Sequence, residues 1–153
     1  MRYFTLFVAL IGLCLFSCKD KTLTPEEQLI EDISNIKQYL SDHNLNADST
    51  ASGIYYVITQ EGSGDHPNLQ STVTVKYKGN LLDGTVFDQT VGAETASFEL
   101  TGLIAGWQQA IPLLKKGGKG TFLIPSYLCY GPSGVGPIPP NSPLAFDIEL
   151  VDF

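Results

Sequence analysis

The hydrophobic pattern of the chain changes twice, and each change marks a different kind of structure. Residues 3–16 are almost continuously apolar, residues 29–40 carry apolar side chains at helical spacing, and apolar and polar residues alternate from residue 54 onward. Alternation with a period of two is typical of strands with one buried face, and recurrence every three to four residues is typical of an amphipathic helix. The pattern therefore predicts an apolar leader, a helix, and a domain built mainly of β-strands.

A helix is predicted to start at Pro25 and to end near His43. Thr24 is a good N-cap residue, Pro25 stands at the first helical position, and acids follow in the first turn. Residues 44–52 are polar and rich in turn formers, so residues 25–52 are interpreted as a helix and a linker. We expect this helix to pack on the domain, to form a dimer, or to space the domain from a membrane.

The strand-forming part, residues 53–153, is predicted to be one α+β domain. Its five most strand-like segments are residues 54–58, 72–78, 96–100, 120–125 and 144–151. Asp83-Gly84 is a strong hairpin signal, residues 106–114 predict one short helix, and the Pro- and Gly-rich residues 126–143 predict a long loop. Several antiparallel strands and one short helix favour a helix that lies across a half-open sheet.

The apolar leader has the features of an export signal. One Arg precedes an apolar run of roughly 14 residues, which is shorter than the ~20 that a membrane-spanning helix needs. The run ends in Leu15-Phe16-Ser17-Cys18, which resembles the bacterial lipobox, whose cysteine is acylated and becomes the mature N-terminus. An ordinary signal peptide cut elsewhere, or a buried helix, is the alternative.

The lipobox resemblance implies a specific location. Residues 1–17 are then a lipoprotein signal peptide and residues 18–24 a lipidated tether. The mature protein is expected to be exported and anchored through a lipid on Cys18 to a bacterial membrane, most simply the outer membrane, facing the periplasm or the cell surface.

Charge and reactive side chains narrow the possible functions. With 16 acidic and 9 basic residues, the net charge of −7 argues against a nucleic-acid partner. If Cys14 leaves with the signal and Cys18 carries lipid, Cys129 stands alone, and we expect it to be a small buried hydrophobe. His43 and His66 lack metal-ligand spacing. If the chain is an enzyme, we expect it to work without metal, cofactor or nucleophile.

Five aromatic residues lie beside strand ends, the start of the short helix, or the long loop: Tyr77, Phe87, Trp107, Tyr130 and Phe146. A normal core explains each of them when it is taken alone. Tyr and Trp carry polar tips that need partners when buried, and binding pockets combine such apolar walls with a few oriented hydrogen bonds. The combination, with an acid directly after Phe87, therefore favours a pocket.

Four segments along the chain resemble, in order, the signature segments of the FKBP-type peptidyl-prolyl cis-trans isomerases: VKYKGNLLDGTVFD, GLIAGWQQAI, LIPSYLCYG and IPPNSPLAFDIELV. The resemblance implies a twisted antiparallel sheet wrapped around the short helix, with an apolar pocket between them. It implies acceleration of Xaa-Pro isomerisation in exported proteins, without cofactor or covalent intermediate. Proline-containing polypeptides would be the clients, and macrolides would be possible inhibitors.

The resemblance also implies roles for single residues. The positions carried over as catalytic are Tyr77, Phe87, Asp88, Trp107, Tyr130 and Phe146, and those carried over as substrate-binding are Leu103, Ile104 and Ile138. Trp107 would form the pocket floor, and three aromatic residues would form its walls. Asp88 would accept a hydrogen bond from Tyr77, while the Tyr130 hydroxyl and the Ile104 backbone N–H would bind substrate carbonyls. Leu103 would lie at the rim, and Ile138 would close over the pocket.

Three departures from the family pattern modify these expectations. Ala96 stands where many members have a further aromatic wall, which predicts one open wall and weaker binding of bulky ligands. Tyr127 replaces a common Asp, and the loop 132–137 is about one residue shorter than in the human archetype. The rival functions are a binding module with little catalysis, for which the N-terminal helix would be the interaction surface, and a purely structural lipoprotein.

Overall fold

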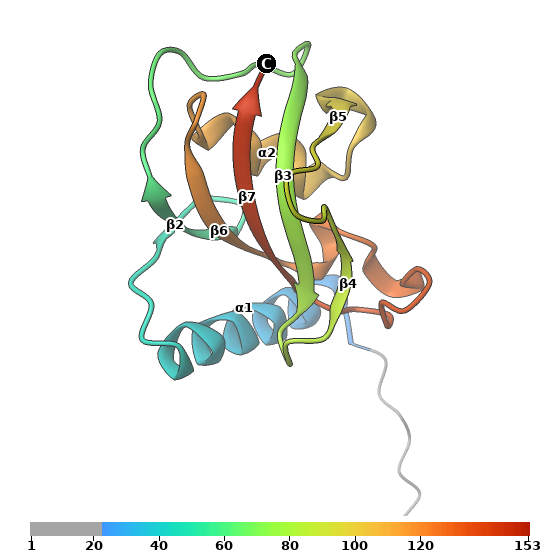
Figure 1. Cartoon of the computed structure of the whole chain (residues 1–153). Helices are drawn as coiled ribbons and strands as arrows, with labels where there is room; N and C mark the ends of the chain where they lie inside the picture. The colour runs from blue at the N-terminus through green and yellow to red at the C-terminus, as the bar shows by residue number, and fades with distance from the viewer. Residues whose placement is uncertain (1–22) are drawn as a thin grey trace, which may run out of the picture.

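The computed structural model describes residues 23–153, in which one long helix packs on a seven-stranded antiparallel sheet (Figure 1). The predicted signal peptide, residues 1–17, and the predicted lipid site, Cys18, lie outside the described residues. Within residues 23–153, every helix is too short or too polar to span a bilayer.

Helix α1, Pro25–Asp42, begins and ends where the sequence predicts. The Thr24 hydroxyl accepts a hydrogen bond from the Glu27 N–H at 3.2 Å, and the Glu27 carboxylate accepts one from the Thr24 N–H at 2.9 Å. This capping box satisfies backbone donors that a helix start leaves free. After the C-cap His43, Asn44 takes a φ of 53°, a left-handed conformation that ends helices. The predicted N-terminal helix is thus confirmed.

The strands form one sheet in the order β1-β2-β6-β7-β3-β4, with β5 also paired to β3. Their bounds are β1 Asp48–Ser49, β2 Tyr55–Gln60, β3 Thr72–Leu81, β4 Val86–Gln89, β5 Ala96–Glu99, β6 Lys119–Ile124 and β7 Leu144–Asp152. One edge of β3 pairs with β7, and its other edge is shared between β5 and β4. Between these two partners, Tyr77 exchanges hydrogen bonds with Thr90 of the β4–β5 connection. The middle of β3 is therefore a place where side chains from several segments can meet.

The main core lies between helix α2, Ala105–Ala110, and one face of the sheet (Figure 1). Trp107 and Ala110 of α2 belong to the same buried cluster as Val75, Phe122 and Ile148 of the strands. Within the described part of the chain there are also four short 3₁₀ turns, at Leu100–Gly102, Ile111–Leu113, Ser126–Leu128 and Gly131–Ser133. The predicted α+β class, with an antiparallel sheet around a short helix, is confirmed.

Helix α1 covers the opposite face of the sheet at one end (Figure 1). Its Ile36 and Leu40 are buried against Leu123 of β6 and Ala145 of β7. Leu123 and Ala145 each lie next to strand residues whose side chains face the main core. Because side chains alternate along a strand, Leu123 and Ala145 point to the opposite face of the sheet. Of the roles expected for this helix, packing on the domain is the one that the structure shows.

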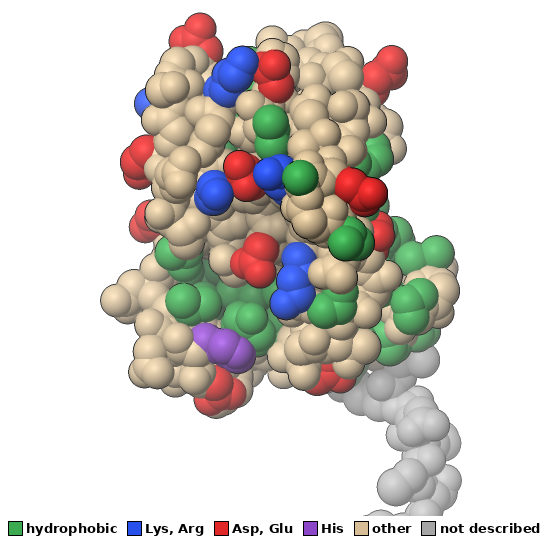
Figure 2. Space-filling model, viewed as in Figure 1, with side chains coloured by type: hydrophobic (Ala, Val, Ile, Leu, Met, Phe, Trp, Pro, Cys, Tyr) green, Lys and Arg blue, Asp and Glu red, His purple; other side chains and the backbone are tan. Residues whose placement is uncertain are grey.

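Beyond α1, this outer face of the sheet is polar. Lys119 and Glu149 form an ion pair at 3.2 Å, and the Thr121 hydroxyl donates to Asp147 at 2.7 Å. Figure 2 shows acidic and basic side chains together over the strands, and a hydrophobic area where α1 meets the sheet. The alternation seen in the sequence is explained by these two faces, one buried on α2 and the other polar except under α1.

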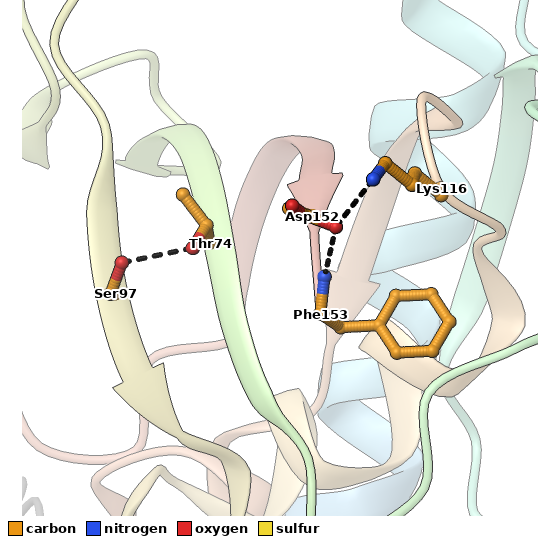
Figure 3. A network of polar contacts seen from close by, with 5 residues as sticks. All are labelled: Thr74, Ser97, Lys116, Asp152 and Phe153. Carbon is orange, nitrogen blue, oxygen red and sulfur yellow. Dashed lines mark hydrogen bonds and ion pairs between the residues drawn. The ribbon is translucent and has the colours of Figure 1, made fainter.

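Polar contacts also connect neighbouring segments at the end of the sheet that is far from α1 (Figure 3). The Thr74 and Ser97 hydroxyls lie 2.9 Å apart and join β3 to β5. Asp152, near the C-terminus, accepts from Lys116 at 2.7 Å and from the Phe153 N–H at 3.0 Å. Both partners of this ion pair are more than half exposed, so the pair contributes little to stability.

Three boundaries differ from the sequence prediction. The predicted linker contains strand β1, which pairs with Tyr55 and Tyr56 of β2. Strand β3 continues to Leu81, because β4 and β7 still pair with its last residues. The short helix ends at Ala110 and continues as a 3₁₀ turn, since Pro112 lacks the N–H that an α-helix needs.

Candidate functional site

A hollow of about 180 Å³ opens between α2 and the sheet, beside the middle of β3. Its lining is mostly aromatic, and comprises Tyr77, Phe87, Asp88, Phe98, Leu103, Ile104, Trp107, Tyr130 and Phe146. These residues come from four strands, the start of α2 and the loop after β6. Two larger hollows lie along α1, and neither contains any of these side chains.

Trp107 forms the floor of the hollow and is only 5% exposed. It reaches this place because Gly106 lets α2 approach β6 closely: a Cβ on Gly106 would lie 2.5 Å from Cγ2 of Ile124 and 3.1 Å from the Leu128 carbonyl oxygen. The Trp107 indole N–H is buried and has no hydrogen-bond partner among the described residues.

Three aromatic rings stand edge-to-face on Trp107. Its ring centroid lies 5.1 Å from that of Tyr77, 5.4 Å from that of Phe146 and 6.2 Å from that of Phe98, with interplanar angles of 84–86°. Such T-shaped pairs are favourable, each by about 0.5–1.5 kcal/mol beyond the burial of area. The rings therefore hold each other in fixed positions around a flat floor.

A further wall is made by Phe87 and Phe146, whose ring centroids are 5.7 Å apart at 85°. Both rings pack over Gly79 of β3, where an added Cβ would lie 2.6 Å from Phe87 and 2.9 Å from Phe146. The glycine of the KGN segment is thus required by the close approach of two aromatic rings.

The acid of the hollow, Asp88, is held by Tyr77. The Tyr77 hydroxyl donates to Oδ2 of Asp88 at 2.6 Å, as the hairpin geometry of β3 and β4 allows. Burial, this hydrogen bond and the charge of Asp88 raise the pKa of Tyr77 to about 12, so the phenol stays protonated at neutral pH. The pair provides an acceptor in fixed orientation, at the edge of an otherwise apolar surface.

Two further residues of the lining carry polar groups, the Tyr130 hydroxyl and the Ile104 backbone N–H. Tyr130 lies between the 3₁₀ turns Ser126–Leu128 and Gly131–Ser133 of the loop after β6, and its pKa is raised by burial and by nearby Cys129 and Asp88. Its hydroxyl is therefore a hydrogen-bond donor at neutral pH. Ile104 is the N-cap of α2, and its backbone N–H donates to no other atom within residues 23–153. A donor pair around an aromatic floor can bind the carbonyl groups of an extended peptide.

The structure brings together all but one of the residues carried over from the family. Only Ile138 is not among the lining residues; it is 5% exposed and belongs to the main core. Its side chain belongs to the same buried cluster as Trp107 and Phe146, and its expected role as a lid over the hollow stays a prediction.

Phe98 is a lining residue that the sequence analysis missed. It lies on the same side of β5 as Ala96, opposite Val73 of β3, and packs on Tyr77 and Trp107. The wall that Ala96 was expected to leave open is thus occupied by an aromatic ring two residues later. The alternation of Ala96, Phe98 and Leu100 on one side of the strand was the available signal.

Other side chains with possible chemistry lie outside the hollow. Burial raises the pKa of the Cys129 thiol, which points to the Ile124 carbonyl oxygen at 3.9 Å and is an inert packing group. His43 stacks on Tyr39, and His66 lies 3.1 Å from the Leu114 carbonyl oxygen. Among residues 23–153, no three His, Cys, Asp or Glu side chains gather as a metal site would require.

Comparison with known proteins gives a consistent result. Residues 64–151 match the model of the FKBP-type peptidyl-prolyl cis-trans isomerases. The FKBP-type peptidyl-prolyl cis-trans isomerase FkpA of Escherichia coli is 45% identical over 105 residues, which are 68% of this chain and 39% of FkpA. The outer membrane protein MIP of Legionella longbeachae is 44% identical over 102 residues, 65% of this chain and 44% of MIP. The chain thus spans less than half the length of these relatives.

The likeness extends to the solved structures. The crystal structure of FkpA from Escherichia coli superimposes with a TM-score of 0.72 and 38% sequence identity, over 83% of this chain and 61% of that one. The larger share of this chain in the structural match, compared with the sequence match, indicates that part of the segment before residue 64 also has a counterpart there.

Proposed function

Because this chain belongs to the family of FKBP-type peptidyl-prolyl cis-trans isomerases, we propose that it accelerates the cis-trans isomerisation of Xaa-Pro bonds in exported proteins. The observation that carries the proposal is the aromatic hollow, with Trp107 as floor and the Tyr77–Asp88 pair at its edge. A proline ring on Trp107 would be surrounded by the same rings that hold the floor in place.

The reaction needs no proton transfer and no covalent bond to the protein. Rotation about a peptide bond has a barrier of about 18–20 kcal/mol because twisting removes amide resonance. A prolyl bond left alone isomerises in tens to hundreds of seconds. A twisted amide is less polarised than a planar one, so a water-poor aromatic surface favours it relative to bulk water. Each ~1.4 kcal/mol of such preference increases the rate about tenfold.

The polar groups of the hollow orient the substrate in this mechanism. The Tyr130 hydroxyl and the Ile104 N–H would donate to carbonyl oxygens on either side of the proline, and Leu103 would contact the chain at the rim. Asp88 acts as a fixed acceptor that keeps Tyr77 in place and polarises the edge of the hollow. It is not a general base in this account. Ile138, on the long loop, would close over the bound proline.

Export and lipid anchoring are part of the same proposal. The outer membrane protein MIP among the relatives supports an exported protein, and the lipobox-like ending at Cys18 supports a lipid anchor. We expect the full chain, produced in a bacterium, to fractionate with membranes and to incorporate labelled fatty acid. A Cys18→Ala variant that takes up label as the wild type does would overturn the anchor assignment.

Macrolide inhibitors are expected to bind the hollow. Phe98 supplies the aromatic wall that Ala96 does not, so the expected weakening by Ala96 is smaller than the sequence alone suggests. The fluorescence of Trp107, the single tryptophan of the chain, reports such binding directly.

A binding platform with little catalysis is the second candidate. It is favoured by Ile30, an apolar side chain of α1 that is 71% exposed and open to a partner. A measurement of catalytic turnover distinguishes an isomerase from a binding platform. The full chain, purified in detergent, is expected to accelerate isomerisation of a short Xaa-Pro peptide, and a folded chain without any acceleration would leave the binding platform as the function.

A further inference from the structure

A buried carboxylate of α1 accepts a hydrogen bond from the loop that carries Tyr130. Asp32 is 1% exposed, and its Oδ2 accepts a hydrogen bond of 2.7 Å from the Ser126 backbone N–H. Its Oδ1 accepts a second bond of 2.8 Å from the Gln28 side-chain amide. A buried carboxylate is costly unless it is hydrogen-bonded, and hydrogen bonds to an ionised acceptor are the stronger kind. Asp32 is therefore a firm attachment between two segments that lie 94 positions apart.

The attachment point is close to the functional hollow. Ser126 begins the 3₁₀ turn Ser126–Leu128, and its carbonyl oxygen accepts from the Cys129 N–H at 2.9 Å. Tyr130, which lines the hollow, follows directly after Cys129. The Leu128 carbonyl also lies against Gly106 of α2, beside the floor. Because each step is a backbone hydrogen bond or a peptide link, the position of Ser126 constrains the backbone at Tyr130, whose side chain lines the hollow.

A second contact fastens the same loop to the linker. The Tyr127 hydroxyl donates to the Ser52 carbonyl oxygen at 2.8 Å, and the Ser52 hydroxyl donates to Gln109 of α2 at 2.6 Å. Next to Ser52, Gly53 packs against Ile33 of α1 and Pro125, both within 4 Å of where its Cβ would be. The turn 126–128 is thus hydrogen-bonded to α1 through Ser126 and to the linker through the adjacent Tyr127.

From these contacts we infer that Asp32 is a positioning residue for the proposed isomerase site: through Ser126 it fixes the loop whose Tyr130 hydroxyl faces the hollow. The inference rests on the proposed function for its effect on rate, although the effect on the loop does not depend on it. Both anchors lie before residue 64, outside the span that matches the family model. Helix α1 then helps to position the site and is not only a spacer.

The test compares Asp32→Asn and Asp32→Ala with Leu40→Ala in the full chain purified in detergent. Leu40 is buried at the other end of α1 and makes no hydrogen bond to the loop, so its truncation loosens the helix without removing the attachment. At a temperature where each variant is fully folded, kcat/KM for a short Xaa-Pro peptide is expected to fall about threefold in Asp32→Asn and about tenfold in Asp32→Ala. The fall should lie mainly in kcat, since the floor and walls that bind the proline ring stay in place.

Leu40→Ala is expected to unfold at a lower temperature and to keep wild-type kcat/KM. Wild-type kcat/KM in a folded Asp32→Ala, or an equal fall in Leu40→Ala, would overturn the inference, because either result assigns Asp32 a purely structural role. If Asp32→Ala does not fold, Asp32→Asn decides, since Asn has nearly the same shape and keeps one acceptor oxygen.

Amide hydrogen exchange separates this inference from the proposed function. The Ser126, Leu128 and Cys129 amides are expected to exchange faster in the Asp32 variants than in Leu40→Ala, whether or not the wild type accelerates isomerisation. An inactive wild type with this exchange pattern sinks the proposed function and keeps the positioning role. Unchanged exchange at these amides sinks the positioning role whatever the activity is.

Discussion

The Tyr77 hydroxyl and the Asp88 carboxylate are joined by a hydrogen bond of 2.6 Å across the β3–β4 hairpin. The bond explains why an acid directly follows an aromatic wall residue in this chain. Phe87 contributes its ring to the hollow. Asp88, the next residue, accepts the hydrogen bond from the Tyr77 hydroxyl and so fixes the ring of a second wall residue. Sheet, turn and pocket thus depend on one short segment.

Removing only the Tyr77 hydroxyl should weaken the site without opening it. In Tyr77→Phe the ring still packs on Trp107, but Asp88 loses its donor. A hydrogen bond to a charged group contributes about 1.5–3 kcal/mol, and less where the acceptor is exposed as it is here. We expect kcat/KM for an Xaa-Pro peptide to fall roughly fivefold, measured beside Tyr55→Phe, which is far from the hollow. An unchanged kcat/KM would show that the bond has no part in the reaction.

The raised pKa of Tyr77 predicts a loss of stability at high pH. In the folded chain the pKa of the Tyr77 phenol is about 12, while in the unfolded chain it returns to the ordinary tyrosine pKa of 10.0. Between these values the folded state binds more protons, so the free energy of unfolding falls as the pH rises from 10 to 12. Urea unfolding across this range should show a shallower fall for Tyr77→Phe than for the wild type. Identical slopes would contradict the assignment to Tyr77.

Gly79→Ala should deform the aromatic wall. The added Cβ overlaps the Phe87 and Phe146 rings, which line the hollow and must shift to make room for it. Overpacking of this kind typically costs about 1–3 kcal/mol of unfolding free energy. We also expect weaker binding of a proline peptide, followed by Trp107 fluorescence. Gly102→Ala is the matched control, because a Cβ there meets no atom within 4 Å. Equal behaviour of the two variants would speak against the packing described for Gly79.

The capping box at the start of α1 should contribute to stability but not to chemistry. Thr24→Ala removes the acceptor for the Glu27 N–H and is expected to lower the free energy of unfolding by about 1 kcal/mol. Thr24→Ser keeps the hydroxyl and should retain most of that energy. Thermal unfolding of the three chains measures the difference. A Thr24→Ala chain as stable as the wild type would indicate that α1 is held by packing alone.

Much of the fold could be predicted because its signals are local. The Thr24 cap, the strict alternation through β3 and the Asp83-Gly84 turn each depend on neighbours in the chain, and the structure confirms the elements they predict. The aromatic floor and walls could be named only through the resemblance of four short segments to the FKBP-type family, because a normal core explains each aromatic residue when it is taken alone.

The remainder depended on contacts between distant segments. Nothing near Asp32 in the sequence indicates that its carboxylate reaches Ser126, and a charged residue on a helix is expected to face water. Phe98 fills the wall that Ala96 was expected to leave open, and the alternation along β5 indicates only that the two share a side, while the contacts of Phe98 with Tyr77 and Trp107 depend on the tertiary fold. Ile138 was expected to close over the hollow, and the structure buries its side chain in the same core cluster as Trp107, which no local pattern indicates. These are tertiary outcomes, and only the assembled fold displays them.

The most direct test of the central claim is the isomerisation rate of a short Xaa-Pro peptide, with the full chain in detergent as catalyst. The wild type is compared with the double variant Asp88→Val, Tyr130→Phe and with a control that makes the same changes away from the hollow, Asp65→Val, Tyr55→Phe. We predict acceleration by the wild type and the control, and at least a tenfold lower kcat/KM for the double variant. Acceleration that survives in the folded double variant would place the reaction elsewhere, and a folded wild type without acceleration would contradict the claim that this hollow is an isomerase site.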